Sequence, residues 1–245
     1  TYSGRIHAVR DVSFTLKKGE TLVVVGESGC GKSMTARAIM QLLPEKISEV
    51  GEQSQILFNG TDILKMPEKK KETELRGKYI SMIFQEPMTA LNPVFRIGDQ
   101  VDEVLALHNE KGHDEAQIKA RTIELLEMVG IANSEGVYKM FPHELSGGMR
   151  QRVMIAMALA CDPDILIADE PTTALDVTIQ AQIIELMQEM QEKNGNAIIM
   201  ITHDLGVVAD MADKIMVMYA GRPVEFGTAE EIFYESRHPY TWGLI

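Results

Sequence analysis

The segment GESGCGKS at residues 26–33 has the form G-x-x-x-x-G-K-[ST] and sets the expected fold of this chain. The β-branched run TLVVV at residues 21–25 precedes it and predicts a buried parallel strand, while residues 33 to about 43 have the spacing of an amphipathic helix. The glycines of the segment allow positive φ, so successive N–H groups can point into one concavity. This order of strand, loop and helix predicts a phosphate-binding loop in an α/β fold, and it argues against a glycine-rich turn with a chance lysine.

The lysine and serine that close this loop have separate predicted roles. Lys32 opens a helix, so its ammonium and the positive end of the helix dipole both face the β- and γ-phosphates of a bound nucleotide. Ser33 supplies a hydroxyl for Mg²⁺. We therefore predict a site for ATP and Mg²⁺. Its expected contacts in this part of the chain are Gly26, Glu27, Ser28, Gly29, Cys30, Gly31, Lys32, Ser33 and Met34.

A second apolar run, at residues 165–168, is followed by two carboxylates, Asp169 and Glu170. The run predicts a strand, and open α/β sheets place their ligands at the C-terminal ends of strands. Asp169 is predicted to hold Mg²⁺ through water, and Glu170 to act as general base on the attacking water. An apolar run followed by Asp-Glu is a weak pattern alone, but after a phosphate loop in the same chain it strongly indicates ATP hydrolysis.

Apolar spacing predicts that strands alternate with helices along most of the chain, as in a parallel sheet. Residues 1–25 have the pattern of short alternating strands, and residues 217–226, broken at Gly221-Arg222, that of a terminal hairpin. The run at residues 65–78, rich in Lys and Glu, is expected to be a solvated loop or helix face rather than a binding tail. Further strands are expected at residues 55–58, 79–85, 165–169 and 197–202, the last of which leads to His203.

Between about residues 88 and 160 the apolar residues recur at helical spacing without strands between them. This pattern predicts an inserted α-helical lobe. The segment LSGGMRQR at residues 145–152 would lie at the start of its last helix. Because the chain contains no internal repeat, we expect residues 1–245 to form one nucleotide-binding domain and not a tandem pair.

Composition limits the possible partners and compartments. The chain has 36 acidic and 24 basic residues and a net charge of −12, which disfavours nonspecific binding to nucleic acid and a polybasic hold on anionic lipid. No apolar stretch approaches the ~20 residues of a membrane helix, and no signal-peptide pattern is present, so a soluble or peripherally docked protein is expected. The two cysteines lack metal-ligand spacing and fit a reducing cytosol.

In their order along the chain, the motifs resemble those of nucleotide-binding subunits of ABC transporters. These motifs are the phosphate loop at 26–33, Gln85 in IFQEP, LSGGM at 145–149, ILIADEPTTALD at 165–176 and Ile201-Thr-His203. Three further segments resemble the ATPases of bacterial and archaeal oligopeptide, dipeptide and nickel importers. They are FQEPMTALNP at 84–93, FPHELSGGMRQRVMIA at 141–156 and HPYTWGL at 238–244.

The resemblance implies a fold, an activity and a set of partners. The fold is a P-loop NTPase core with a mostly parallel sheet, an N-terminal antiparallel β subdomain and the inserted helical lobe. The activity is ATP hydrolysis that drives uptake of peptides, or of nickel or other small solutes, through separate membrane permeases. The partners are integral membrane permease subunits, a second ATPase subunit that is identical or paralogous, and indirectly an extracytoplasmic solute-binding protein. The expected location is the cytoplasmic face of the membrane, as a peripheral subunit.

The resemblance also implies that two chains build each nucleotide site. Ser146, Gly147 and Gly148 match the signature that closes on the γ-phosphate held by the opposite subunit, with a hydroxyl, N–H groups and a helix N-terminus as donors. Asp176 matches the loop that crosses the dimer interface. A single chain would therefore not complete its own site.

Three further residues receive roles from the resemblance. Gln85 matches the glutamine that reaches the metal and the attacking water, in a loop that touches the membrane subunit. His203 matches the switch histidine that contacts the γ-phosphate. Tyr2 could be the aromatic residue that stacks on adenine, or a surface tyrosine. The predicted catalytic set is thus Glu170, His203, Gln85 and Lys32, and the predicted metal set is Ser33, Gln85 and Asp169.

Two other functional classes compete with a transporter subunit. A soluble ABC ATPase that acts on DNA or ribosomes usually carries long coiled-coil insertions or two ATPase domains, and this sequence has neither. A nucleotide-binding regulator would not need a base such as Glu170. The sequence therefore favours the transporter ATPase.

Overall fold

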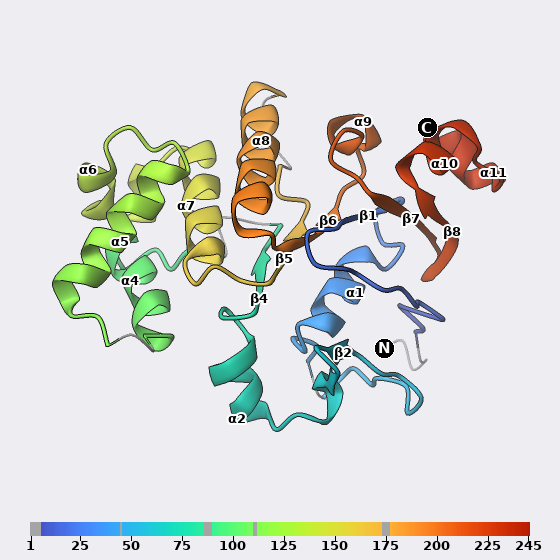
Figure 1. Cartoon of the computed structure of the whole chain (residues 1–245), viewed down its shortest axis with the longest axis horizontal. Helices are drawn as coiled ribbons and strands as arrows, with labels where there is room; N and C mark the ends of the chain where they lie inside the picture. Colours follow the sequence, from blue (N-terminus) through green and yellow to red (C-terminus); the bar gives the residue numbers. More distant parts are fainter. Residues whose placement is uncertain (1–5, 45, 86–89, 110–111, 173–176) are drawn as a thin grey trace, which may run out of the picture.

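Six strands form the central sheet in the part of the chain that the computed structural model describes, residues 6–44, 46–85, 90–109, 112–172 and 177–245. The sheet runs through the middle of the molecule (Figure 1). In sheet order the strands are β4 (Ile80–Ile83), β5 (Ile165–Asp169), β6 (Ala197–Ile201), β1 (Thr21–Val25), β7 (Lys214–Tyr219) and β8 (Arg222–Thr228). Neighbouring strands are parallel except β7 and β8, which form an antiparallel hairpin. The mostly parallel sheet and the terminal hairpin are both confirmed.

The central strands β1, β5 and β6 are mostly apolar because the sheet is covered on both faces. In β1, Val23 and Val25 belong to one core cluster, and Leu22 and Val24 belong to another. All four side chains are at most 2% exposed. This alternation, with a partner cluster on either side, explains why a run without polar residues forms a strand here.

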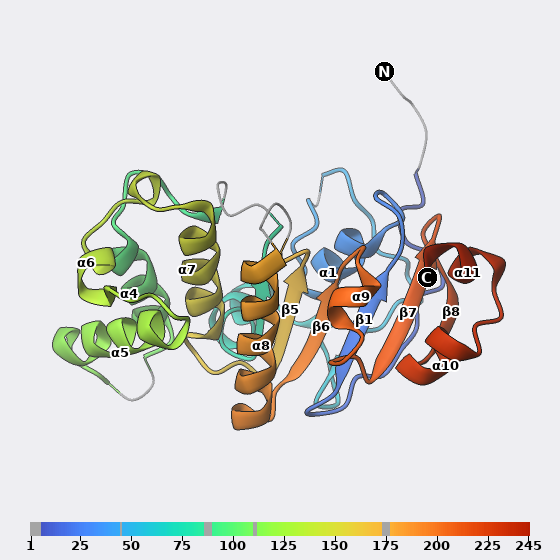
Figure 2. The same ribbon diagram turned by 90° about the horizontal axis from the view of Figure 1, so that it is seen from above.

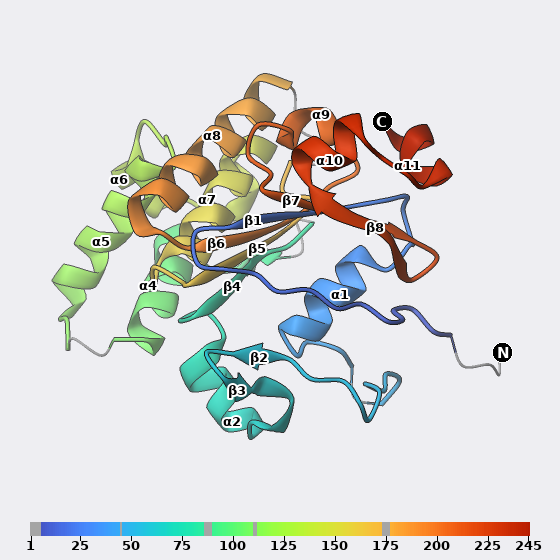
Figure 3. The same ribbon diagram turned by 45° about the vertical axis from the view of Figure 1, so that its right-hand side comes forward.

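Helices cover the two faces of the sheet. One face carries α1 (Lys32–Ile39), and the other carries α8 (Val177–Asn194), α9 (Leu205–Val208) and α10 (Ala229–Tyr234), as Figure 3 shows. The chain then continues into α11 (Pro239–Leu244). The helix after the phosphate loop ends at Ile39, earlier than the predicted residue 43, because Gln41 adopts a left-handed conformation with φ 55°. Within the described residues, every helix is too short or too polar to span a bilayer.

A group of helices lies at the left of the molecule in Figure 2, at the end of the sheet where β4 is the edge strand. It contains α4 (Ile97–Leu107), α5 (Glu115–Met128), α6 (Ser134–Tyr138) and α7 (Gly147–Leu159), and α7 contacts β4. A capping box between Asp114 and Gln117 fixes the start of α5. The helical character predicted for residues 88–160 is therefore confirmed where the chain is described, although residues 88, 89, 110 and 111 lie outside that part. The division of the chain into a domain and a lobe stays a prediction.

The prediction of short strands before residue 21 is wrong for residues 6–20, which contain no strand. The alternating apolar residues of this segment do not mark a strand. Instead, Val12, Phe14 and Leu16 pack against the core cluster on the α1 face. Among the backbone bonds of this segment, the N–H of Arg10 donates to the carbonyl oxygen of Gly221 at 2.6 Å. Alternate burial thus occurs here in a segment that joins no sheet.

The expected antiparallel pair is formed later in the chain, by β2 (Leu57–Phe58) and β3 (Thr61–Asp62). Asn59 and Gly60 join them with φ of 47° and 80°, as a tight hairpin turn requires. The charged run that follows is mostly helical, which agrees with the expected helix face. Its segments are Ile63–Lys65, α2 (Glu68–Lys70) and Lys71–Leu75, and a separate short turn is Pro142–Glu144.

We predict that Gly26→Ala destabilises the nucleotide-free protein more than Gly29→Ala does. A Cβ at Gly26, where φ is 147°, would lie 2.2 Å from the carbonyl oxygen of Met218, whereas Gly29 has φ 79° and no atom within 4 Å of its Cβ position. Left-handed strain costs about 1–2 kcal/mol per residue, and only Gly26→Ala must also displace β7. Melting temperatures of both variants test this, and equal losses would contradict the proposed packing of the loop against β7.

Candidate active site

Four parallel strands end at the same edge of the sheet, and each delivers part of the candidate site. The phosphate loop follows β1, and Gln85 follows β4 by two residues. Glu170 follows β5 directly, and His203 follows β6 by two residues. Because parallel neighbours share their direction, residues more than a hundred positions apart in the sequence meet at this edge (Figure 2). This is where open α/β sheets bind their ligands.

The phosphate loop has the backbone conformation that the glycines predicted. Gly26, Gly29 and Gly31 have φ of 147°, 79° and 107°. A Cβ at Gly31 would lie 2.6 Å from the carbonyl oxygen of Ala8, so the loop lies close to the N-terminal segment there. The turn between β7 and β8 also holds the loop, since the N–H of Gly221 donates to the carbonyl oxygen of Cys30 at 2.9 Å. The loop is therefore fixed by contacts with the N-terminal segment and with the turn between β7 and β8.

Lys32 is a buried cation, with 4% of its side chain exposed. Its Nζ donates to the carbonyl oxygens of Gly26 at 2.7 Å and Glu27 at 3.1 Å. Its Nζ also lies 4.0 Å from Oε1 of Glu170. A buried charge requires such partners, and the lysine is thereby held over the loop that is predicted to bind phosphate.

Ser33 and Asp169 are joined by a hydrogen bond of 2.8 Å from the serine Oγ to the aspartate Oδ1. Asp169 is 1% exposed. Burial raises the pKa of Asp169 above its ordinary value; the hydrogen bond from Ser33 opposes this rise, and the charge of Glu170 adds to it. The site therefore has an anion whose charge is incompletely compensated, which favours binding of a cation.

This pair fits Mg²⁺ in the chemistry of its donors. Mg²⁺ is usually held by one or two carboxylates together with waters and phosphate oxygens of the substrate, rather than by an all-protein cage. Accordingly, a serine hydroxyl and one carboxylate are sufficient protein donors. The described residues contain no group of three or more His, Cys, Asp or Glu side chains that could hold a metal by themselves.

Besides Lys32, two further predicted residues contact the carboxylate of Glu170. Gln85 Nε2 donates to Glu170 Oε2 at 3.0 Å, and His203 Nδ1 lies 3.7 Å from the same oxygen. Glu170 has φ 48°, and its N–H donates to the carbonyl oxygen of Ile201 at 2.9 Å. A non-glycine residue with positive φ is uncommon, and such strain clusters at functional sites. The structure thus brings the predicted catalytic and metal residues into one group.

The signature residues lie on a different element. Ser146 is the N-cap of α7, where its Oγ accepts from the N–H of Met149 at 3.3 Å, and Gly147 and Gly148 are the first residues of that helix. The hydroxyl of Ser146 is therefore bonded within its own helix. Tyr2 and Asp176 lie outside the described residues.

Two contacts that reach the site were not predicted from the sequence. Gln151 Nε2, on α7, donates to the carbonyl oxygen of Pro171 next to Glu170. Tyr240 Oη, on α11, accepts from the N–H of Glu27 at 2.9 Å. Both residues lie in segments, 141–156 and 238–244, whose sequence resembles that of the importer ATPases. This resemblance is the sequence signal that could have indicated them. Neither contact follows from local spacing.

Comparison with known proteins extends this description. The family model described as ABC transporter matches residues 9–173. The whole chain is 58% identical to the oligopeptide transport ATP-binding protein OppD of Bacillus subtilis (strain 168) and spans 67% of its length. It is 55% identical to the dipeptide transport ATP-binding protein DppD of Lactococcus lactis subsp. cremoris (strain MG1363) over the whole chain and 69% of that protein.

Solved structures resemble the fold. The ATP-binding cassette MJ0796, in a dimeric post-hydrolysis state bound to ADP and Pi, superposes with a TM-score of 0.82 at 25% identity over 94% of each chain. The structure of cbiO1 from Clostridium perfringens, part of the ABC transporter complex cbiONQ, has a TM-score of 0.79 at 30% identity over 96% of this chain and 87% of that one. The core described above is therefore that of an ATP-binding cassette.

We predict that Asp169→Asn raises the melting temperature of the nucleotide-free protein and removes most of its stabilisation by Mg-ATP. Because the folded-state pKa of Asp169 is raised, its charge lowers the free energy of unfolding above that pKa, and this penalty is absent below the ordinary pKa of an aspartate. Asparagine keeps an oxygen that can accept from Ser33 but has no charge. Thermal melts at neutral pH with and without Mg-ATP test both signs. A fall in the nucleotide-free melting temperature would contradict the electrostatic account of this site.

Proposed function

The chain belongs to the ABC transporter family, and on that premise we propose that it is the ATP-hydrolysing subunit that drives peptide import through separate membrane permeases. The observation that carries this proposal is the convergence of Gln85, His203 and Lys32 on Glu170, beside the bonded pair of Ser33 and Asp169. A nucleotide-binding regulator would need no such base. Relatives named for oligopeptide or dipeptide transport, at 53–58% identity over the whole chain, favour peptides over nickel or another small solute.

Each group around the site has a defined part in the proposed hydrolysis. Glu170 is the general base, and its Oε2 is the oxygen that accepts the proton of the attacking water. Gln85 and His203 both face this oxygen and orient it. Lys32 supplies a fixed positive charge beside the loop that binds the phosphates. Ser33 and Asp169 would hold Mg²⁺, which neutralises charge on the phosphate oxygens when bound.

We further propose that a second ATPase subunit, identical or paralogous, completes each site. The N-terminus of α7, a helix of 13 residues, presents N–H groups suited to an anion, and it carries Ser146, Gly147 and Gly148. In this proposal these residues bind the γ-phosphate held by the phosphate loop of the other chain. The dimeric structure of MJ0796 supports the presence of a second ATPase subunit. The roles of Asp176 at the interface and Tyr2 at adenine remain proposals from the family resemblance.

The proposed assembly places the subunit at the cytoplasmic face of a membrane. It would contact integral membrane permease subunits directly and an extracytoplasmic solute-binding protein only indirectly. The net charge of −12 disfavours the alternative of an ATPase that acts on DNA or ribosomes. We propose one nucleotide-binding domain over residues 1–245, in which residues 88–160 form the helical subdomain.

Co-purification tests the proposed function directly. The tagged chain, expressed with its neighbouring open reading frames and extracted in mild detergent, is expected to retain two integral membrane permeases. Its ATPase rate is expected to rise when peptide-loaded binding protein is added to the reconstituted complex. Retention of nucleic acid or ribosomes in place of membrane proteins would overturn the transporter assignment.

We predict that Glu170→Gln converts the enzyme into a dimer trapped with ATP. Glutamine can still hydrogen-bond the attacking water but cannot accept its proton, so hydrolysis should slow by on the order of 10² or more. Binding should persist, because Lys32, Ser33 and Asp169 are unchanged. Light scattering should detect dimers with Mg-ATP and monomers with ADP, and a phosphate-release assay gives the rate.

The matched control adds Lys32→Ala to Glu170→Gln, and this double variant should stay monomeric with ATP. Hydrolysis at the wild-type rate by Glu170→Gln would exclude Glu170 as the base. A variant that is inactive and yet monomeric with Mg-ATP would contradict a dimer of identical chains.

A further inference from the structure

The C-terminal helix α11 reaches the start of the phosphate loop. Tyr240, in its first turn, accepts the backbone N–H of Glu27 on its Oη at 2.9 Å. Glu27 directly follows Gly26, so this bond fixes the first peptide unit of the loop. A residue 213 positions away in the sequence thus satisfies a donor of the nucleotide-binding backbone.

The same peptide unit is held at both ends. Its carbonyl oxygen belongs to Gly26 and accepts from Lys32 Nζ at 2.7 Å, while its N–H belongs to Glu27 and donates to Tyr240. An ammonium at the carbonyl polarises the amide and strengthens the bond that its N–H donates, since hydrogen bonds in a chain reinforce one another. The Tyr240 hydroxyl therefore orients the peptide plane on which Lys32 rests.

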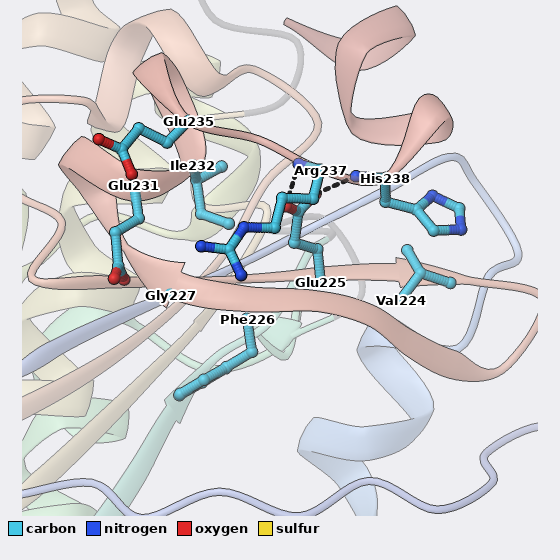
Figure 4. Close-up of a pocket in the computed structure, with 9 residues that line it drawn as sticks. All are labelled: Val224, Glu225, Phe226, Gly227, Glu231, Ile232, Glu235, Arg237 and His238. Atoms are coloured by element: carbon cyan, nitrogen blue, oxygen red, sulfur yellow. Dashed lines mark hydrogen bonds between the residues drawn. The ribbon is translucent and has the colours of Figure 1, made fainter.

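Several contacts hold Tyr240 and the residues just before it. Glu225 on β8 accepts from the N–H groups of Arg237 at 2.6 Å and His238 at 3.2 Å, as the dashed lines in Figure 4 show. His238 Nδ1 then accepts from the N–H of Tyr240 at 3.2 Å. The ring of Tyr219 packs against that of Tyr240 with centroids 4.7 Å apart. The hydroxyl consequently has a defined position, as a group that orients the loop requires.

We propose that Tyr240 is a positioning residue for the phosphate loop, and that through it α11 and the nucleotide site are coupled. This inference rests on the proposed binding of ATP at the loop. The alternative is that Tyr240 only packs against the hairpin of β7 and β8. Coupling and packing predict different results, because linkage between two sites is reciprocal. If α11 and the loop are coupled, a nucleotide that reorients the loop changes the surroundings of α11. A change in α11 then also alters the affinity for nucleotide.

The chain has a built-in reporter for this coupling. Trp242 is its single tryptophan, and it lies on α11 two residues beyond Tyr240. Its indole Nε1 donates to the carbonyl oxygen of Ser236 at 2.6 Å, and the residue is 62% exposed. Its fluorescence should therefore respond to a shift of α11.

The test compares Tyr240→Phe with the matched control Tyr219→Phe. Tyr240→Phe keeps the ring contact and removes only the acceptor of the Glu27 N–H, whereas Tyr219→Phe alters the neighbouring ring and leaves that acceptor in place. Calorimetric titration with Mg-ATP should give a dissociation constant about 3-fold to 10-fold higher for Tyr240→Phe, as loss of one hydrogen bond predicts, and an unchanged value for Tyr219→Phe. Trp242 emission should change on Mg-ATP binding in the wild type and less in Tyr240→Phe.

The outcomes separate this inference from the proposed function. A wild-type chain that binds no Mg-ATP would overturn the proposed function and this inference with it. Equal affinity of Tyr240→Phe and the wild type would overturn the inference alone, even if the variant melted at a lower temperature, because packing without positioning predicts that result. An identical Trp242 response in the two proteins would overturn the coupling.

Discussion

Burial of the central sheet on both faces determines where polar chemistry can occur in this protein. β1, β5 and β6 present apolar side chains to a core cluster on each side, so polar groups in contact with a ligand must lie at strand ends. The parallel registers of these strands bring their carboxyl ends to one edge. Asp169 is the informative case: it is the last residue of β5, it is buried, and it still reaches Ser33 on α1.

The charges at this edge are unevenly balanced. Asp169 and Glu170 are adjacent carboxylates, and Lys32 is the buried ammonium within 4.0 Å of Glu170. Burial and the neighbouring charge of Glu170 raise the pKa of Asp169 in this state, even though Ser33 donates to it. A divalent cation would relieve this imbalance. The same electrostatics would favour a metal-bound triphosphate over a free one at the proposed site.

The parts of the site that follow from local pattern were predictable from the sequence. The positive φ of Gly26, the start of α1 at Lys32 and the position of Asp169 at a strand end all follow from residue type and order. The contact between Tyr240 and Glu27 did not, because it joins distant segments through a helix whose docking no periodicity encodes. Similarly, alternate apolar residues at 12–16 indicated burial but could not show that the segment joins no sheet.

Mixing two variants with complementary defects tests whether two copies of this chain share each site. One chain carries Lys32→Ala and the other Ser146→Arg, and both carry Glu170→Gln to prevent turnover. A mixed dimer then has one site with an intact phosphate loop from the second chain and an intact signature from the first. If two copies of this chain share each site, the mixture forms ATP-dependent dimers in light scattering, and each variant alone stays monomeric. A mixture that stays as monomeric as its separate components would contradict a site shared by two copies of this chain.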